Sequence, residues 1–159
     1  HESASSPSLL SSIPKGLSFV ELASPPSTPL SDHHSSYGGL CLIFKSSFSV
    51  SVDSSIKFSS FECLFTSIKS TSLKLNLIII YRPPKSSKPQ FLDDFYNLSE
   101  FLYSLSTSFY ILGDLNIPLN KPADPYVSQF LEILSTFNLS QHCNFPTHKL
   151  GNTLDPIIH

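Results

Sequence analysis

Residues 61–81 read FECLFTSIKSTSLKLNLIIIY, two apolar runs on either side of a short polar break. The runs extend from Phe61 to Ile68 and from Leu73 to Tyr81, and each has the length of a strand. The break, Ser70-Thr71-Ser72, has turn composition and the length of a hairpin connection. Pro83-Pro84 ends the second run. This stretch therefore predicts an antiparallel pair of strands.

Two further strand patterns lie upstream of this pair. Gly38-Gly39 opens the apolar run Leu40 to Phe44, which is typical of a buried strand after a tight turn. Phe48, Val50 and Val52 then alternate with serines, which is the period of a half-buried strand.

The first part of the chain differs in composition. Residues 1–36 are rich in serine and proline, so we expect mostly irregular structure there, with one short strand near Leu17 to Glu21. We accordingly divide the chain into an irregular N-terminal part, residues 1–36, and one folded domain, residues 37–159.

Downstream of the hairpin the apolar period changes from that of strands to that of helices. From Phe91 to Leu105 apolar residues recur every three or four positions, which predicts an amphipathic helix of about four turns. Asp124-Pro125 supplies an N-cap followed by a first-turn proline, and the apolar spacing from Val127 to Phe137 predicts a second helix.

Two short strands flank the second helix. One runs from Phe109 to Leu112, and the other from Leu154 to Ile158, where Pro156 restricts it to an edge or a distorted end. Strands, helix, strand, helix, strand is an order that predicts an α/β or α+β sandwich, with a mainly antiparallel sheet and helices on its face.

The composition argues against several classes of protein. With 40% hydrophobic and 12% aromatic residues, a chain of 159 residues can bury a core. The longest apolar run, Leu75 to Tyr81, is far shorter than the roughly 20 residues that span a bilayer, so we expect no membrane role. A net charge of -2 gives no general attraction for nucleic acid, and DNA binding would need a local patch. Cys41, Cys63 and Cys143 are odd in number and far apart, which favours buried free thiols in a reducing compartment.

Six short strings stand in a characteristic order along the domain. They are Gly38-Gly39 with its apolar strand, Phe61-Glu62, Tyr81-Arg82-Pro83-Pro84, Gly113-Asp114-Leu115-Asn116, Pro146-Thr147-His148 and Gly151-Asn152-Thr153-Leu154-Asp155. In this order they resemble the apurinic-site-type endonuclease of non-LTR retrotransposons, within the exonuclease-endonuclease-phosphatase superfamily. The resemblance extends from about Tyr37 to Ile158, and it implies a partial sandwich of that superfamily, truncated at both ends.

The resemblance implies catalytic roles for residues at the ends of strands. Asp114 would be the base that activates water, and Asn116, on the same side in extended geometry, would donate to the phosphate. The alternative for this pair is an Asx-type turn that ends the strand. Tyr81 would contact the scissile phosphate, or else cover the core as a strand-end aromatic. Asp155 would orient a catalytic histidine on a later strand.

Three residues are candidates for substrate binding. Arg82 would bind a DNA phosphate with two hydrogen bonds, or be solvated at a turn, and with Lys85 and Lys88 it forms a basic cluster near the expected site. Asn152 and His148 belong to strings typical of the retrotransposon branch, where they would face DNA. The alternative for His148 is a hydrogen-bonded surface histidine.

Two catalytic groups of the resembling family have no clear counterpart. Its metal-binding glutamate lies in a Glu-Thr-Trp-like string, and Glu2 lies near where that glutamate would fall but is followed by Ser3-Ala4-Ser5. We interpret the adjacent His33-His34 as solvated, because neighbouring side chains in an extended loop point apart. The Asp-His pair of the family's closing strand is absent, and we do not assign His159 to it.

The first hypothesis is a Mg²⁺-dependent (or Mn²⁺-dependent) endonuclease that nicks DNA so that a reverse transcriptase domain of the same polypeptide can prime there. Without the glutamate and the imidazole we expect little or no activity. The sequence begins at His1 rather than Met, so we interpret it as part of a longer one. The resemblance implies that it acts inside the cell, in the nucleus. The alternatives are a non-catalytic remnant that binds DNA weakly, and a hydrolase of lipid phosphoesters in the same superfamily.

Overall fold

The structure, a computed structural model, describes residues 13–22 and 39–159, which form two sheets and two helices. The smaller sheet pairs β1 (Leu17–Leu22) with β2 (Leu40–Lys45). The larger sheet contains, in spatial order, β3 (Ser49–Asp53), β4 (Glu62–Lys69), β5 (Lys74–Tyr81), β6 (Phe109–Asp114) and β7 (Ile157–Ile158). The helices are α1 (Lys88–Ser104) and α2 (Pro125–Thr136).

The larger sheet is antiparallel except at one pair of strands. β3 with β4, β4 with β5, and β6 with β7 are antiparallel, as the hairpin pattern predicted for β4 and β5, whereas β5 and β6 are parallel. A parallel pair needs a long crossover connection, and α1 is that connection. The carboxyl ends of β5 and β6 therefore lie side by side, with Tyr81 opposite Asp114.

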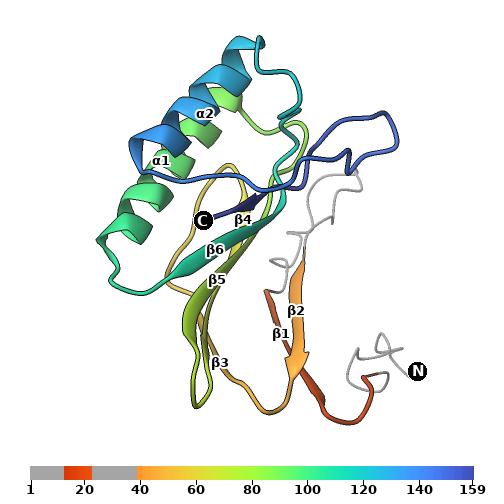
Figure 1. Cartoon of the computed structure of the whole chain (residues 1–159), viewed down its shortest axis with the longest axis vertical. Helices are drawn as coiled ribbons and strands as arrows, with labels where there is room; N and C mark the ends of the chain where they lie inside the picture. The colour runs from red at the N-terminus through yellow and green to blue at the C-terminus, as the bar shows by residue number, and fades with distance from the viewer. Residues whose placement is uncertain (1–12, 23–38) are drawn as a thin grey trace, which may run out of the picture.

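The elements form three layers (Figure 1). Both helices cover one face of the larger sheet, and the smaller sheet lies on the other side. This arrangement confirms the predicted α/β sandwich with a mainly antiparallel sheet and helices on its face.

The main core lies between the helices and the larger sheet. Phe91 and Phe95 of α1 and Phe130 of α2 are fully buried, and the ring centroids of Phe95 and Phe130 are 4.8 Å apart. These rings share one cluster with Ile78 and Ile80 of β5. Complete burial of a side chain of this size contributes about 1.5–3 kcal/mol, so the cluster fixes both helices over the centre of the sheet.

Both helices have capped beginnings. The Ser87 hydroxyl accepts a hydrogen bond from the main-chain N–H of Gln90. This cap starts α1 at Lys88, before the predicted apolar pattern begins at Phe91. The Asp124 carboxylate accepts from the N–H of Tyr126 at 2.8 Å, which confirms the predicted cap of α2. Neither helix of the described residues is long and apolar enough to cross a membrane.

The last strand is shorter than the sequence predicted. β7 is an edge strand of only two residues. The carbonyl oxygen of Leu154, which was expected to belong to this strand, accepts a hydrogen bond from the Leu115 N–H at 3.1 Å, in the turn after β6. Pro156 has no N–H to continue the ladder. The segment before β7 is therefore part of a loop rather than of the sheet.

The cysteines agree in part with the expectation of buried thiols. All three are free, and Cys63 and Cys143 are buried. Burial raises the pKa of Cys63 to about 12, which keeps that thiol protonated and unreactive. The expectation is wrong for Cys41, because its place on β2 leaves it exposed.

Candidate functional site

The candidate site lies where β5 and β6 end together. Tyr81 and Asp114 are the last residues of these strands and lie opposite each other, both half-buried. On the other side of Tyr81, Glu62 of β4 accepts a hydrogen bond from the Gly39 N–H at 3.0 Å, which ties the smaller sheet to the larger one.

The chain turns sharply after Asp114. One carboxylate oxygen of Asp114 accepts a hydrogen bond from the Asn116 N–H at 2.9 Å, and Asn116 has a left-handed backbone with φ of 50°. This is the Asx-type turn, so the expected extended pair of side chains is wrong. The Asn116 side-chain amide donates one hydrogen to the carbonyl oxygen of Arg82 at 2.7 Å. Its second Nδ2–H has no hydrogen-bond partner among the described residues and stays available to a ligand.

Arg82 is not where either sequence-based alternative placed it. Its side chain is only 2% exposed, so it is not solvated at a turn. One terminal nitrogen donates to the carbonyl oxygens of Leu115 and Asn116, and the other donates to that of Ser86. The guanidinium is buried and its terminal nitrogens are hydrogen-bonded to main-chain carbonyl oxygens, so it is not placed to bind a DNA phosphate. Its contacts are with the turn after β6 and with Ser86.

The strings Pro-Thr-His and Gly-Asn-Thr-Leu-Asp form one closed loop. The Thr147 hydroxyl accepts hydrogen bonds from the N–H groups of Leu154 and Asp155, at 2.9 and 3.2 Å. The N–H groups of Thr147 and His148 both donate to the carbonyl oxygen of Asn152 at 3.0 Å. Asn152, which was expected to bind substrate, closes this loop through its main-chain carbonyl oxygen.

Two residues that the sequence reasoning missed hold this loop in place. Thr147 accepts hydrogen bonds within the loop. Its hydroxyl, in the string Pro-Thr-His, is the feature of the sequence that could have indicated this role. Asn120, in the connection between β6 and α2, donates to the Gly151 carbonyl oxygen and accepts from the Thr153 N–H. Together with the hydrogen bond between Leu115 and Leu154, these contacts bring the loop beside the Asp114 turn.

The charges of this loop act on Asp114. Burial raises the pKa of the Asp114 carboxyl most, and the nearby Asp155 carboxylate raises it further. The Asn116 N–H, His148 and Arg82 oppose this shift, but the net pKa lies above the ordinary value. Asp155 and His148 therefore both lie within electrostatic reach of Asp114.

His148 is held in a defined orientation. Its Nδ1 accepts a hydrogen bond from the Leu150 N–H at 3.2 Å, so in the neutral ring the proton is on Nε2. The side chain is half-buried.

A complete metal site is not present among residues 13–22 and 39–159, where no group of three or more His, Cys, Asp or Glu side chains is placed to hold an ion. Glu2 and the His33-His34 pair lie outside the described residues. Lys85 and Lys88, the expected basic cluster, are exposed, and the Lys88 ammonium lies 4.9 Å from the ring centre of Tyr126.

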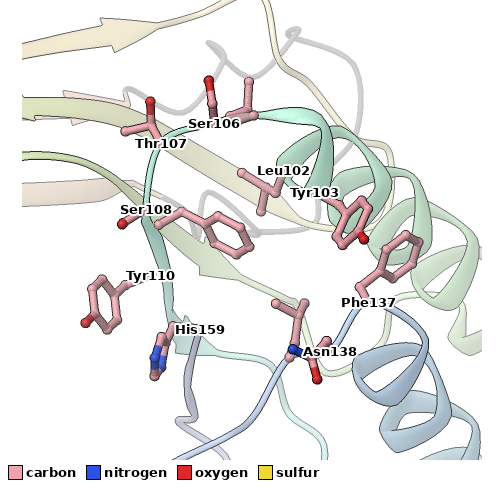
Figure 2. A pocket seen from close by; sticks show the side chains of 12 residues that line it. Leu102, Tyr103, Ser106, Thr107, Ser108, Tyr110, Phe137, Asn138 and His159 are labelled. Atoms are coloured by element: carbon pink, nitrogen blue, oxygen red, sulfur yellow. The ribbon is translucent and has the colours of Figure 1, made fainter.

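A hollow lies at the end of β6 opposite to Asp114 (Figure 2). It has a volume of about 550 Å³, and its lining includes Tyr103, Tyr110, Phe137 and His159. The Tyr110 and His159 rings stack with centroids 5.0 Å apart. Since Phe109 and Tyr110 begin the strand that Asp114 ends, this hollow is separate from the candidate site.

Comparison with solved structures identifies similar folds. The endonuclease domain of TRAS1, a telomere-specific non-LTR retrotransposon, superposes with a TM-score of 0.65 at 12% identity, over 91% of this chain and 65% of that one. The human Nocturnin catalytic domain with bound sulfate anion superposes with a TM-score of 0.61 at 15% identity, over 90% of this chain and 60% of that one. The chain therefore shares the mixed α/β sandwich fold of these two domains.

The similarity has clear limits. The chain spans less than two thirds of the length of either solved structure. No protein-family model matches the sequence, and no curated protein matches it. At these identities the similarity establishes the fold alone.

Proposed function

We propose that this chain is, by descent, the DNA endonuclease domain of a non-LTR retrotransposon, and that it hydrolyses phosphodiesters poorly or not at all. The observation that supports the proposal is that the loop carrying His148 and Asp155 is hydrogen-bonded beside Asp114, at the carboxyl ends of β5 and β6 in a nuclease-like fold. In the complete element, a reverse transcriptase domain of the same polypeptide would prime from the nick in the nucleus.

The chemistry follows from the environment of each group. A raised pKa makes Asp114 a stronger base toward water, while Arg82 and His148 favour its ionised form. The second Nδ2–H of Asn116 would donate to a phosphoryl oxygen, and so would the Nε2–H of His148. Tyr81 stands beside Asp114 and would contact the same phosphate.

A divalent cation fits this site in part. Asp155 raises the pKa of Asp114 by repulsion between like charges, and a cation held by the two carboxylates would relieve that repulsion. Mg²⁺ is commonly bound through one or two carboxylates plus substrate phosphates. Bound there, Mg²⁺ or Mn²⁺ would offset charge on the phosphoryl oxygens.

The proposed loss of activity rests on two missing groups. The sequence contains neither the Glu-Thr-Trp-like string nor the Asp-His pair of the family it resembles. Removing one preorganised group of this kind typically costs about a hundred-fold or more in rate.

A plasmid-nicking assay tests the proposal. The purified chain is incubated with supercoiled plasmid and Mg²⁺ or Mn²⁺, beside Asp114→Asn. We expect at most trace conversion to the open circle, and none with the variant. Fast nicking that depends on Asp114 would contradict the predicted inactivity, and nicking that is unchanged in the variant would contradict the site.

The second candidate is a remnant that binds DNA without cutting it. Lys85, Lys121 and Lys149 are exposed in the connections that precede α1, α2 and β7, and Lys88 is exposed at the start of α1. If all four contact phosphates, affinity for duplex DNA should fall about a hundred-fold between 50 and 200 mM salt. Fluorescence anisotropy with a labelled duplex measures this. Absence of binding at low salt would count against both candidates, and hydrolysis of a lipid phosphoester in a parallel assay would favour a different substrate.

A further inference from the structure

The side chain of Arg82 is enclosed by three elements. It follows β5 directly, and its guanidinium carbon lies 5.0 Å from the ring centre of Phe91 in α1 and 5.4 Å from that of Tyr126 in α2. All its hydrogen bonds within the described residues go to main-chain carbonyl oxygens. Arg82 is thus a buried cation without a carboxylate hydrogen-bonded to it in the described part of the chain.

Core stability alone does not account for an arginine in this place. Removing a guanidinium from water is costly unless all its donors are satisfied, and the Arg82 Nε–H has no hydrogen-bond partner among the described residues. An apolar side chain of similar volume would fill the space between Phe91 and Tyr126 without that cost. What it would lose is the set of hydrogen bonds to the turn after β6.

We propose that Arg82 is a positioning residue for the candidate site, holding the Asp114 turn in its left-handed form. The contacts are reciprocal. The guanidinium donates to the carbonyl oxygens of Leu115 and Asn116, while the carbonyl oxygen of Arg82 accepts from the Asn116 side-chain amide. The Arg82 N–H also donates to the Asp114 carbonyl oxygen at 2.9 Å, so both strand ends are fixed to each other. This role rests on the proposed function of Asp114.

The geometry requires arginine rather than any cation. One terminal nitrogen reaches two carbonyl oxygens, at 3.2 and 3.3 Å, and the other reaches Ser86 at 3.1 Å on the opposite side. A planar fork serves these directions together, whereas a lysine ammonium is a single point on a flexible stem. Lysine at this position would keep the charge and lose the hold on the turn.

The same cation favours the ionised form of Asp114. It opposes the rise in the Asp114 pKa that burial and Asp155 cause. Arg82 therefore affects the candidate base in two ways, through the shape of the turn and through charge, and two substitutions separate them. Arg82→Lys removes the first, and Arg82→Met removes both.

Two measurements on the folded chain test this inference without requiring catalysis. The first is the pKa of Asp114, from the carboxyl carbon resonance in an NMR titration, and the second is the hydrogen-exchange rate of the Asn116 amide. For Arg82→Met we expect a higher Asp114 pKa and at least ten-fold faster Asn116 exchange. For Arg82→Lys we expect faster exchange with a smaller change in pKa. Lys74→Met, which removes an exposed charge at the other end of β5, should change neither.

Each outcome is decisive for the inference. If Arg82→Lys folds, as judged by circular dichroism, and its Asn116 exchange equals that of the parent, the inference is wrong. If neither variant folds, Arg82 is a core residue and the inference is also wrong. Absence of DNA binding at low salt, together with the expected NMR changes, would instead refute the proposed function and leave the role of Arg82 in the turn intact.

Discussion

Asp114 is held in surroundings that disfavour its charge. Burial and the Asp155 carboxylate destabilise its ionised form, and the Asn116 N–H, His148 and Arg82 offset this only in part. A group kept in such surroundings reduces the stability of the fold at neutral pH, and perturbed groups of this kind are concentrated at functional sites.

Replacing this charge should stabilise the protein. Asp114→Asn keeps an oxygen that can accept the Asn116 N–H and removes the carboxylate. The folded-state pKa lies above the ordinary value of 3.8, so the protonated form is favoured in the fold and stability is lost as pH rises through the folded pKa. We expect the variant to have a higher urea midpoint than the parent at pH 7 and an equal midpoint near pH 3. Equal midpoints at both values would show that the carboxylate is not under strain.

Gly113, one residue earlier, is needed for a different reason. A Cβ atom there would lie 1.9 Å from the Ile80 carbonyl oxygen, and φ of +134° is strained for any other residue. Gly113→Ala should therefore lose more than about 3 kcal/mol or fail to fold, as measured by urea unfolding. Gly16→Ala is the control, since φ of +87° is unfavourable there but nothing lies within 4 Å. Its loss should be only about 1–2 kcal/mol, and equal losses would rule out the clash.

The sequence predicted those elements whose structure depends on residues close together in the chain. The β4–β5 hairpin and the cap of α2 at Asp124 could be predicted because turn and cap residues act within a few positions. The burial of Arg82 could not, because Phe91 and Tyr126 enclose it from two helices. The left-handed turn at Asn116 is fixed by the same distant contacts, so the local motif alone could not predict the geometry of Asp114 and Asn116.

The Thr147 hydroxyl accepts two of the hydrogen bonds that close the loop carrying His148 and Asp155. Thr147→Val keeps the shape of the side chain and leaves the Leu154 and Asp155 N–H groups without their acceptor. Each lost hydrogen bond typically costs about 1 kcal/mol, so we expect a loss of about 1–3 kcal/mol and faster hydrogen exchange at these two amides. Thr147→Ser should retain parental exchange. If valine leaves the exchange rates unchanged, the loop is held by other contacts.

Several large apolar side chains are exposed in the part of the chain that the structure describes. Tyr103, Phe145 and Leu150 are 69%, 64% and 76% exposed, and β7 is a short outer strand with Ile157 44% exposed. Apolar surface and a sheet edge of this kind favour association between molecules.

We therefore expect the chain to associate reversibly at high concentration, detectable as a rise in weight-average mass in sedimentation equilibrium. Ile157→Lys places a charge on the outer strand and should increase the monomer fraction. Asn97→Lys, on an exposed position of α1, is the control for an added charge. A monomer at all concentrations, or equal effects of the two variants, would exclude association through this edge.

The parallel pairing of β5 and β6 also determines when the site can form during synthesis. The β4–β5 hairpin can close as soon as its residues leave the ribosome, but β5 gains its other neighbour only after α1 and β6 have been made. The loop that carries His148 and Asp155 is made later still, and only then can it pack beside Asp114. We expect a nascent chain to expose an apolar, unpaired β5 edge for most of this interval. Chaperones should therefore bind the chain before its candidate site has formed.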